Sequence, residues 1–334
     1  MKIKKLSIKN FKSLIDIEIN EPNPFTVFVG PNGSGKSNIF EAIQLAAIPY
    51  RFGSFPQSHY QWISVFGGYE SIKPKVQHVG NLLIQLFNDT DNRYEINYNF
   101  INEEPLDVLS DVVFADIMNR LPTRDISAIL KNCRRLFINN KEIIKIPESA
   151  SSFLDSSASN MVNVLKRILE EGPLKVEITE WLQIFIPELH KVEVQLNNLN
   201  GNGELAVFEK NISNPLPANL ISDGTKNILS LLTAVYQSNE PQFLCIEEPE
   251  NGLHPYVIKE LVSFFRQQCE DKGHYIWLNT HSQTLVNQLE AKEIIVVNKK
   301  EGKTILKQFK DSNFHGLTMD EAWLSNAMRG GVPW

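Results

Sequence analysis

GPNGSGKS, residues 30–37, fits the pattern G-x-x-x-x-G-K-[ST]. It stands between PFTVFVG (24–30), an apolar run typical of a buried strand, and SNIFEAIQLAAI (37–48), whose apolar residues recur at helical spacing. Glycines let backbone N–H groups curl around a phosphate without a Cβ in the way, and the lysine adds a positive charge. The sequence therefore predicts a strand, a phosphate-binding loop and a helix, in that order.

Two adjacent acids end another apolar run, and a phosphate-binding loop requires an acidic partner of this kind. In FLCIEEPE (243–250), Glu247 and Glu248 follow a stretch that reads as a buried strand. Two carboxylates side by side are costly there unless a cation or a water is bound. We predict that Glu247 holds Mg²⁺ with the hydroxyl of Ser37, and that Glu248 activates the attacking water. The alternative is a solvated turn after the strand.

His281 ends a third apolar run, in WLNTHS (277–282). A histidine at this place can hydrogen-bond a terminal phosphate or the attacking water. Alternatively, it caps the helix that follows. The neighbouring motifs favour the first interpretation.

NLISDGTKNIL (219–229) places small polar residues at the head of an apolar helix. Ser222 or Asp223 there can be an ordinary N-cap. The same helix end also offers backbone N–H groups, the Ser222 hydroxyl and the unobstructed Gly224 to an anion. Because it lacks the G-K pair of the loop at 30–37, we expect it to contact a terminal phosphate that another site already holds.

Strand and helix signals divide the chain into three parts. Strands alternate with helices in 1–103 and 204–334, whereas 104–203 reads mainly as helices with Pro-, Ser- and Asn-rich joints. We therefore predict an α/β fold with a mixed, largely parallel sheet, an N-terminal β-rich lobe and a helical insertion at 104–203. A hairpin is expected over 81–101, and a helix over 125–137.

Composition bounds the function classes. A net charge of −6 argues against a surface that coats nucleic acid throughout, although a local basic patch remains open. The three cysteines have no metal spacing, and neither a secretory signal nor a membrane-spanning run is evident. We expect a cytoplasmic protein that does not act at a membrane.

The ordered set GPNGSGKS, ISDGT, FLCIEEPENGLHP and NTHS resembles the ABC-type ATPase heads of the RecF, SMC and overcoming-lysogenization-defect (OLD) group. It is most similar to the small bacterial AAA-type ATPases of phage-defence operons, and IKNFKSL (8–14) fits their first strand. The resemblance covers about 1–50 and 205–300. It implies an ABC-type P-loop NTPase head that binds ATP and Mg²⁺ and hydrolyses ATP.

Carried over by position, the resemblance gives each motif a role. Glu247 is similar to the Walker B acid, Glu248 to the catalytic glutamate and His281 to the switch histidine, so catalysis is implied for Glu248, His281 and Lys36. The metal would be held by Ser37 and Glu247. The nucleotide would contact the loop and, from the opposite protomer, the signature motif: Gly30, Pro31, Asn32, Gly33, Ser34, Gly35, Lys36, Ser37, Asn38, Ser222, Asp223 and Gly224.

The same resemblance implies partners. We expect a homodimer or higher oligomer closed through the ATP sites, with NGLH (251–254) as the D-loop. No Gln can be assigned to the Q-loop, although Gln57, Gln61 and Gln85 are candidates. Because 293–309 lacks the acids of a toprim domain, we expect no nuclease in the chain, and a separate effector, a nuclease or a toxin, in antiviral defence.

Two other functions stay open. One is a DNA-repair or chromosome-associated clamp, which would contact nucleic acid through the basic stretch 131–145, although such a run is more often a solvated helix face. Its cations are Lys131, Arg134, Arg135, Lys141 and Lys145. The other is a scaffold that binds nucleotide with little turnover, against which the intact Glu248 argues.

Overall fold

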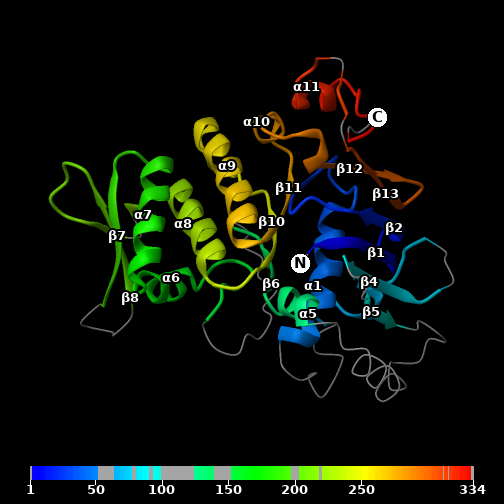
Figure 1. The fold of residues 1–334 in the computed structure, drawn as a ribbon, viewed down its shortest axis with the longest axis horizontal. Helices are drawn as coiled ribbons and strands as arrows, with labels where there is room; N and C mark the ends of the chain where they lie inside the picture. Colours follow the sequence, from blue (N-terminus) through cyan, green and yellow to red (C-terminus); the bar gives the residue numbers. More distant parts are fainter. Residues whose placement is uncertain are drawn as a thin grey trace.

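The computed structural model describes residues 2–51, 64–76, 80–89, 93–98, 124–138, 152–196, 203–217, 220–310, 312–314 and 316–331. This part of the chain contains three sheets, and the strands of the largest sheet lead into the predicted motifs at 30–37, 247–248 and 281 (Figure 1). It has the strand order β13-β12-β3-β11-β10-β6. The strands are β3 (Phe25–Val29), β6 (Cys133–Leu136), β10 (Phe243–Glu247), β11 (Tyr275–Thr280), β12 (Ile294–Lys300) and β13 (Lys303–Gln308).

The central sheet is parallel except at one edge, where β12 and β13 form an antiparallel hairpin. Parallel strands have their carboxyl ends at the same edge of the sheet, where ligands of such sheets bind. The loop that follows β3, the acid pair at the end of β10 and the histidine after β11 therefore meet at one edge. The parallel register also places Glu247 beside Asn279.

Helices cover both faces of the central sheet, because alternate side chains of its strands point to opposite sides. Leu244 and Ile246 of β10 join the apolar core beneath α8 (Asp223–Tyr236) and α9 (Pro255–Lys272). Phe243 and Cys245 face the other way, into the core that includes α1 (Lys36–Arg51). Figure 1 shows α8 and α9 on one side of β10 and α1 on the other.

An antiparallel sheet of order β2-β1-β4-β5 lies on the α1 side. The predicted hairpin is confirmed, since β4 pairs with β5. Tyr94 ties this sheet to α1 by donating from its hydroxyl to the carbonyl of Ala46 at 2.9 Å. The bounds are β1 (Ile3–Phe11), β2 (Leu14–Asn20), α3 (Tyr69–Ile72), β4 (Leu82–Asn88) and β5 (Arg93–Tyr98).

A third unit at the far side of α8 combines helices with a small antiparallel sheet of order β7-β8-β9 (Figure 1). Two of the helices expected in 104–203 are α6 and α7, and Trp181 of α7 packs edge-on against Phe264 of α9. The expected boundary at 203/204 falls directly after the first residue of β8, which pairs with β7. The bounds are α6 (Met161–Leu169), α7 (Gly172–Phe185), β7 (Leu189–Leu196), β8 (Gly203–Glu209) and β9 (Leu216–Pro217).

The prediction of a helix over 125–137 is wrong in its second half. The helix α5 (Arg124–Lys131) ends at Lys131, and Cys133–Leu136 form β6, which pairs in parallel with the buried strand β10. Strand pairing to β10 outweighs the local helical spacing, because all four residues of β6 are buried.

Short elements complete the described chain: α10 (Gln283–Val286), the 3-10 turn η3 (Ala291–Glu293) and α11 (Met319–Leu324). In the ranges given above, no helix has the length and apolar character needed to cross a bilayer.

Candidate functional site

The loop at 30–37 packs against the β12–β13 hairpin, which in turn contacts the turn between β1 and β2. Thr304 donates from Oγ1 to the carbonyl of Ser34 at 2.7 Å, and its hydroxyl lies 2.7 Å from that of Ser13. Gly35 has a φ of +108°, and a Cβ there would lie 2.1 Å from Thr304 Oγ1. Only glycine fits this position, because both the backbone angle and the space exclude a side chain.

Lys36 lies across the mouth of this loop, where its Nζ donates to the carbonyls of Gly30 at 2.7 Å and Pro31 at 3.1 Å. The residue is only 6% exposed. Burial lowers the pKa of Lys36 to about 8, and Glu248 and Glu247 act in the opposite direction. The lysine therefore sits in the loop as a poorly solvated cation that a phosphate would stabilise.

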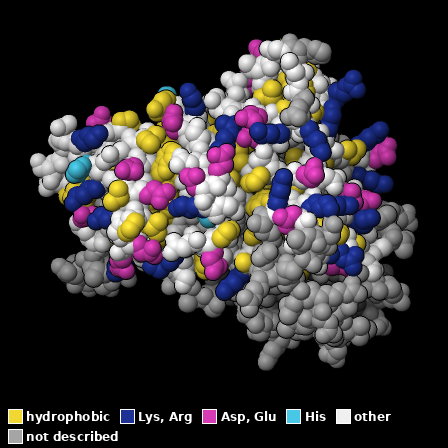
Figure 2. All heavy atoms as spheres, viewed as in Figure 1, with side chains coloured by type: hydrophobic (Ala, Val, Ile, Leu, Met, Phe, Trp, Pro, Cys, Tyr) yellow, Lys and Arg dark blue, Asp and Glu magenta, His cyan; other side chains and the backbone are white. Residues whose placement is uncertain are grey.

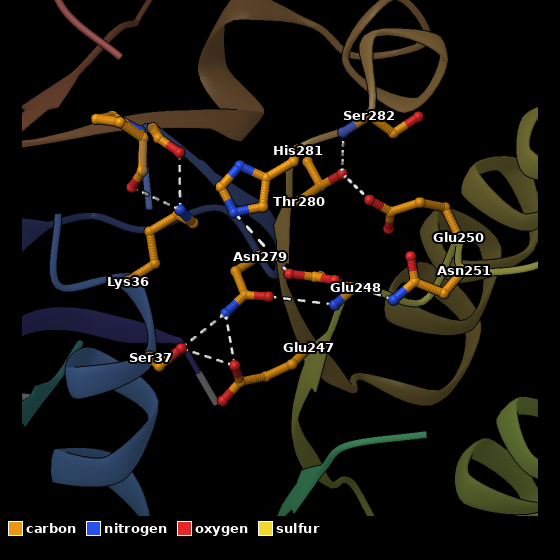
Figure 3. A network of polar contacts seen from close by, with 12 residues as sticks. Lys36, Ser37, Glu247, Glu248, Glu250, Asn251, Asn279, Thr280, His281 and Ser282 are labelled. Atoms are coloured by element: carbon orange, nitrogen blue, oxygen red, sulfur yellow. Dashed lines mark hydrogen bonds and ion pairs between the residues drawn. The ribbon is translucent and has the colours of Figure 1, made fainter. Parts of the chain in front are cut away.

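Glu247 and Ser37, the predicted metal-binding pair, are in direct contact (Figure 3). The Ser37 hydroxyl donates to Glu247 Oε2 at 2.7 Å, and Asn279 Nδ2 donates to the same oxygen at 3.1 Å. Hydroxyl and carboxylate oxygens are the donors that Mg²⁺ prefers. The two oxygen donors expected for a metal thus lie together at the mouth of the loop.

Glu248 is turned away from Glu247 by its backbone, which has a φ of +47°. This left-handed conformation is uncommon for a residue with a side chain and is held here by Asn279, whose backbone and side-chain oxygens accept from Glu248 N at 3.0 and 3.1 Å. Asn251 Nδ2 donates to Glu248 Oε2 at 2.9 Å. Figure 3 shows Glu247 directed toward Ser37 and Glu248 directed toward His281.

His281 lies beside the carboxylate of Glu248, with Nε2 3.9 Å from Oε1. Burial lowers the pKa of His281, Lys36 lowers it further, and Glu248 opposes both, so the imidazole is neutral at physiological pH. The helix-cap alternative is wrong, because Ser282 caps α10 by accepting from Leu285 N at 3.2 Å. His281 is therefore available to a ligand.

Three polar residues that the sequence analysis did not single out complete the network. Asn279 bonds both acids, while the hydroxyl of Thr280 bonds the carboxyl group of Glu250 and accepts from Ser282 N at 2.9 Å. Burial raises the pKa of Glu250. Their signal was present in the sequence, since Asn279 and Thr280 are polar residues in a wholly buried strand and so require partners.

The two arginines of the basic stretch 131–145 do not lie on a solvated face. Arg134 and Arg135 are 6% and 5% exposed on β6, so both the nucleic-acid contact and the exposed helix face predicted for them are wrong. Arg135 instead bonds Glu247, with Nε 2.7 Å from Oε1. Lys131 is exposed, whereas Lys141 and Lys145 lie outside the described residues.

The signature segment is a true helix start. Ser222 caps α8, since its Oγ accepts from Thr225 N at 3.1 Å, and Ser222 and Asp223 are exposed. A Cβ on Gly224 would lie 2.7 Å from the carbonyl oxygen of Gly252. Within the described chain, no hydrogen bond or ion pair joins 222–224 to the loop at 30–37.

The Q-loop stays unassigned. Gln85 lies on β4 and donates to Glu95 Oε2 at 2.9 Å, in the antiparallel sheet. Gln57 and Gln61 lie outside the residues that the structure describes.

Comparison with known proteins gives a family and several relatives. The family model described as "AAA domain, putative AbiEii toxin, Type IV TA system" matches residues 25–287. An ATP/GTP phosphatase of Helicobacter pylori is 22% identical over 338 residues, which cover 86% of this chain and 87% of that protein. A Smc chromosome partition protein of Methanocaldococcus jannaschii is 54% identical over 41 residues, and a RecF DNA replication and repair protein of a Geobacter species is 40% identical over 68 residues. These two matches cover 12% and 20% of this chain, and 4% and 18% of the relatives.

Among solved structures, the chain resembles a Smc head bound to the C-terminal winged-helix domain of ScpA. The TM-score is 0.53 at 14% identity, over 93% of this chain and 98% of that one. This likeness shows the fold and confirms the predicted α/β architecture with a mixed central sheet and an antiparallel lobe. Because the family model spans most of the chain, this protein is an ATPase that belongs to the AAA-domain family of the AbiEii type.

Proposed function

We propose that two copies of this ATPase close head to head around two ATP–Mg²⁺ pairs, and that the open and closed states control a separate effector protein. One observation carries the proposal. Ser222 and Asp223 are exposed at the N-terminus of α8, yet in one chain residues 222–224 make no hydrogen bond or ion pair to the loop that would hold the phosphates. A second copy can supply the missing contact.

The surroundings of 222–224 support such a closure. Asn227 Nδ2 donates to the carbonyls of Pro249 at 3.0 Å and Asn251 at 2.9 Å, so α8 is tied to the segment that follows Glu248. Leu220 and Tyr256 are 65% and 53% exposed, on either side of this junction in the sequence.

A nucleotide fits the loop region. The Ser34 hydroxyl is buried and has no hydrogen-bond partner among the described residues, so the loop holds a polar atom that a ligand can satisfy. Next to the loop is a cavity of about 440 Å³, and it is lined in part by Lys12, Ser13, Asn38, Lys75 and Lys299. Figure 2 shows Lys and Arg side chains interspersed with Asp and Glu side chains where Figure 1 places β13, β2 and β1. Three lysines in the lining of the cavity favour an anionic ligand.

The residues present also fit Mg²⁺, since the Ser37 hydroxyl and Glu247 Oε2 are hard oxygen donors in contact with each other. When bound, Mg²⁺ neutralises charge on the β- and γ-phosphates. In the proposed reaction, Lys36 exchanges its carbonyl partners for phosphate oxygens. Glu248 accepts a proton from the attacking water, and neutral His281 hydrogen-bonds the terminal phosphate.

ATP binding should take up protons in alkaline solution. Lys36 has a pKa of about 8 in the folded chain, and the phosphates favour its charged form, so ATP raises that pKa. Uptake should be close to zero at pH 6.5 and approach one proton per site at pH 9. Calorimetry in buffers of different ionisation enthalpy measures this difference. Lys36→Arg should bind ATP without taking up a proton. Equal proton uptake by the wild type and this variant would contradict the assignment of the uptake to Lys36.

The dimer is tested directly by molar mass. The chain of 38.1 kDa should double in mass when a nonhydrolysable ATP analogue and Mg²⁺ are added, as measured by light scattering after gel filtration. Gly224→Asp should bind the analogue and remain a single chain, because the added carboxylate repels phosphate and its Cβ meets Gly252. Gly172→Asp, at the exposed start of α7, is the matched control. A wild-type chain that binds the analogue without doubling would refute closure.

The setting is inferred from the family. Its description names a toxin of a type IV toxin–antitoxin system, which supports a role in defence through a partner. The partner's chemistry and the absence of a nuclease from this chain stay predictions. The DNA-clamp alternative no longer has Arg134 and Arg135 as surface cations.

A further inference from the structure

A line of alternating charges runs behind the predicted metal site. Lys12 Nζ lies 2.5 Å from Glu41 Oε2, Glu41 Oε1 lies 3.2 Å from Arg135 Nη1, and Arg135 bonds Glu247. The line connects the β1–β2 turn, α1, β6 and β10. Its centre is buried, because the side chain of Arg135 is 4% exposed and that of Glu41 is 13% exposed.

Arg135 decides which oxygen of Glu247 faces the predicted metal site. Its Nε lies 2.7 Å from Oε1, and its Nη2 contacts the same oxygen. The other oxygen, Oε2, accepts from Ser37 and Asn279. Strand alternation explains this direction, since Arg135 shares a face of the sheet with Cys133, on the side of α1, whereas Arg134 shares the opposite face with Leu136.

The stack of Arg135 on Phe137 holds the guanidinium in place. Its Cζ lies 4.0 Å from the centre of the Phe137 ring. With one aromatic face and two carboxylates as neighbours, the group is a fixed positive charge one carboxylate away from the place where a divalent cation would bind.

We propose that Arg135 is a positioning residue whose guanidinium is the counter-ion of the Glu247 carboxylate. The site therefore binds a free divalent cation weakly and takes up the metal only together with nucleotide phosphates. The inference rests on the proposed function in one respect, the assignment of Glu247 as the metal-binding acid. It adds an order of events, because phosphate charge has to offset the repulsion from Arg135 before the metal enters.

Two opposite effects of removing Arg135 have to be weighed. Loss of the restraint on Glu247 weakens metal binding by about ten- to a hundredfold, as is usual for groups that orient a ligand. Loss of a unit charge at about 8 Å from a divalent cation strengthens binding by about a thousandfold at an effective dielectric constant near 20. Because Ser37 and Asn279 still hold Oε2, the charge effect wins. Arg135→Gln should therefore bind free Mn²⁺ at least about tenfold more tightly than the wild type.

The experiment is an electron paramagnetic resonance titration of the full chain with Mn²⁺ alone, repeated with Mn²⁺ and a nonhydrolysable ATP analogue. We expect the tighter binding of Arg135→Gln to be confined to the titration without nucleotide. Arg135→Lys keeps the charge but not the planar group, so its affinity for free Mn²⁺ should stay closer to that of the wild type than the affinity of Arg135→Gln does. Arg134→Gln is the matched control, because that arginine donates to the carbonyls of Lys131 at 2.9 Å and Cys133 at 2.8 Å on the other face of the strand.

A thermal readout separates this role from a merely structural one. Arg135→Gln leaves Glu41 and Glu247 without their shared cation, so its melting temperature should fall without metal and recover in millimolar Mn²⁺. If the variant does not fold in metal-free buffer, Mn²⁺ should restore cooperative unfolding. The proposal would be overturned if Mn²⁺ bound Arg135→Gln no more tightly than the wild type and raised its melting temperature by no more than that of the wild type.

Glu247→Gln distinguishes the inference from the function on which it rests. If that variant binds Mn²⁺ and the analogue as the wild type does, the metal assignment itself fails. If it loses Mn²⁺ while Arg135→Gln behaves as the wild type, only the role of Arg135 fails.

Discussion

Two inactive variants should regain ATP hydrolysis when they are mixed. Lys36→Ala removes the cation of the phosphate-binding loop, and Gly224→Asp places a carboxylate where the helix start would meet phosphate. Each variant alone should fall below about one hundredth of the wild-type turnover, because two copies of the same variant cannot form a whole site. In a mixed dimer, the intact loop of one chain faces the intact helix start of the other.

The expected recovery has a definite size. At equal concentrations half of the dimers are mixed, and each has one whole site, so turnover should return to about a quarter of the wild-type value. Phosphate release at increasing ratios of the two variants measures it, with Lys36→Ala mixed with Lys36→Ala/Gly224→Asp as the control that cannot form a whole site. Should the mixture stay as inactive as its parts, the two motifs do not act across a dimer.

The parts of the fold that the sequence predicted best are those whose chemistry is local. The loop at 30–37 lies between a strand and a helix, as its glycines and flanking apolar runs indicated. The position of the acid pair was also predicted from local sequence. Four apolar residues followed by Glu247 indicate the end of a buried strand, and β10 ends at Glu247.

Pairing between strands that are distant in the sequence could not be predicted from the sequence. Residues 125–137 have helical spacing throughout, yet Cys133–Leu136 pair with β10, more than a hundred positions away. Periodicity reflects only neighbours along the chain, so it favours an exposed helix face for Arg135, which is a buried partner of Glu247. Two adjacent arginines between Cys133 and Leu136 were a usable signal, because buried cations require carboxylate or carbonyl partners.

The roles of Asn279 and Glu250 were concealed for a related reason. Each acts through residues on another strand or loop: Asn279 holds the backbone of Glu248, and Glu250 bonds Thr280. Register between parallel strands decides these contacts, and register is not visible in a single sequence.

Replacing Glu248 by Gln should abolish turnover and trap the closed dimer. Glutamine keeps the size of the side chain and can still bond Asn251, so the loop geometry survives, but an amide cannot accept the proton of the attacking water. Turnover should fall by about a thousandfold, and ordinary ATP should then hold the doubled mass that the wild type shows only with the nonhydrolysable analogue.

Phosphate release and light scattering on the same sample test both halves of this expectation, and Glu270→Gln, on the exposed side of α9, is the matched control. The backbone of Glu248 supports this prediction. Its φ of +47°, which Asn279 holds in place, is unfavourable for a residue with a side chain, and such strain is typical of positions where the direction of the side chain serves function. If Glu248→Gln hydrolyses ATP at the normal rate, the base is misassigned. His281, whose Nε2 lies 3.9 Å from the same carboxylate, would then be the group left to take the proton.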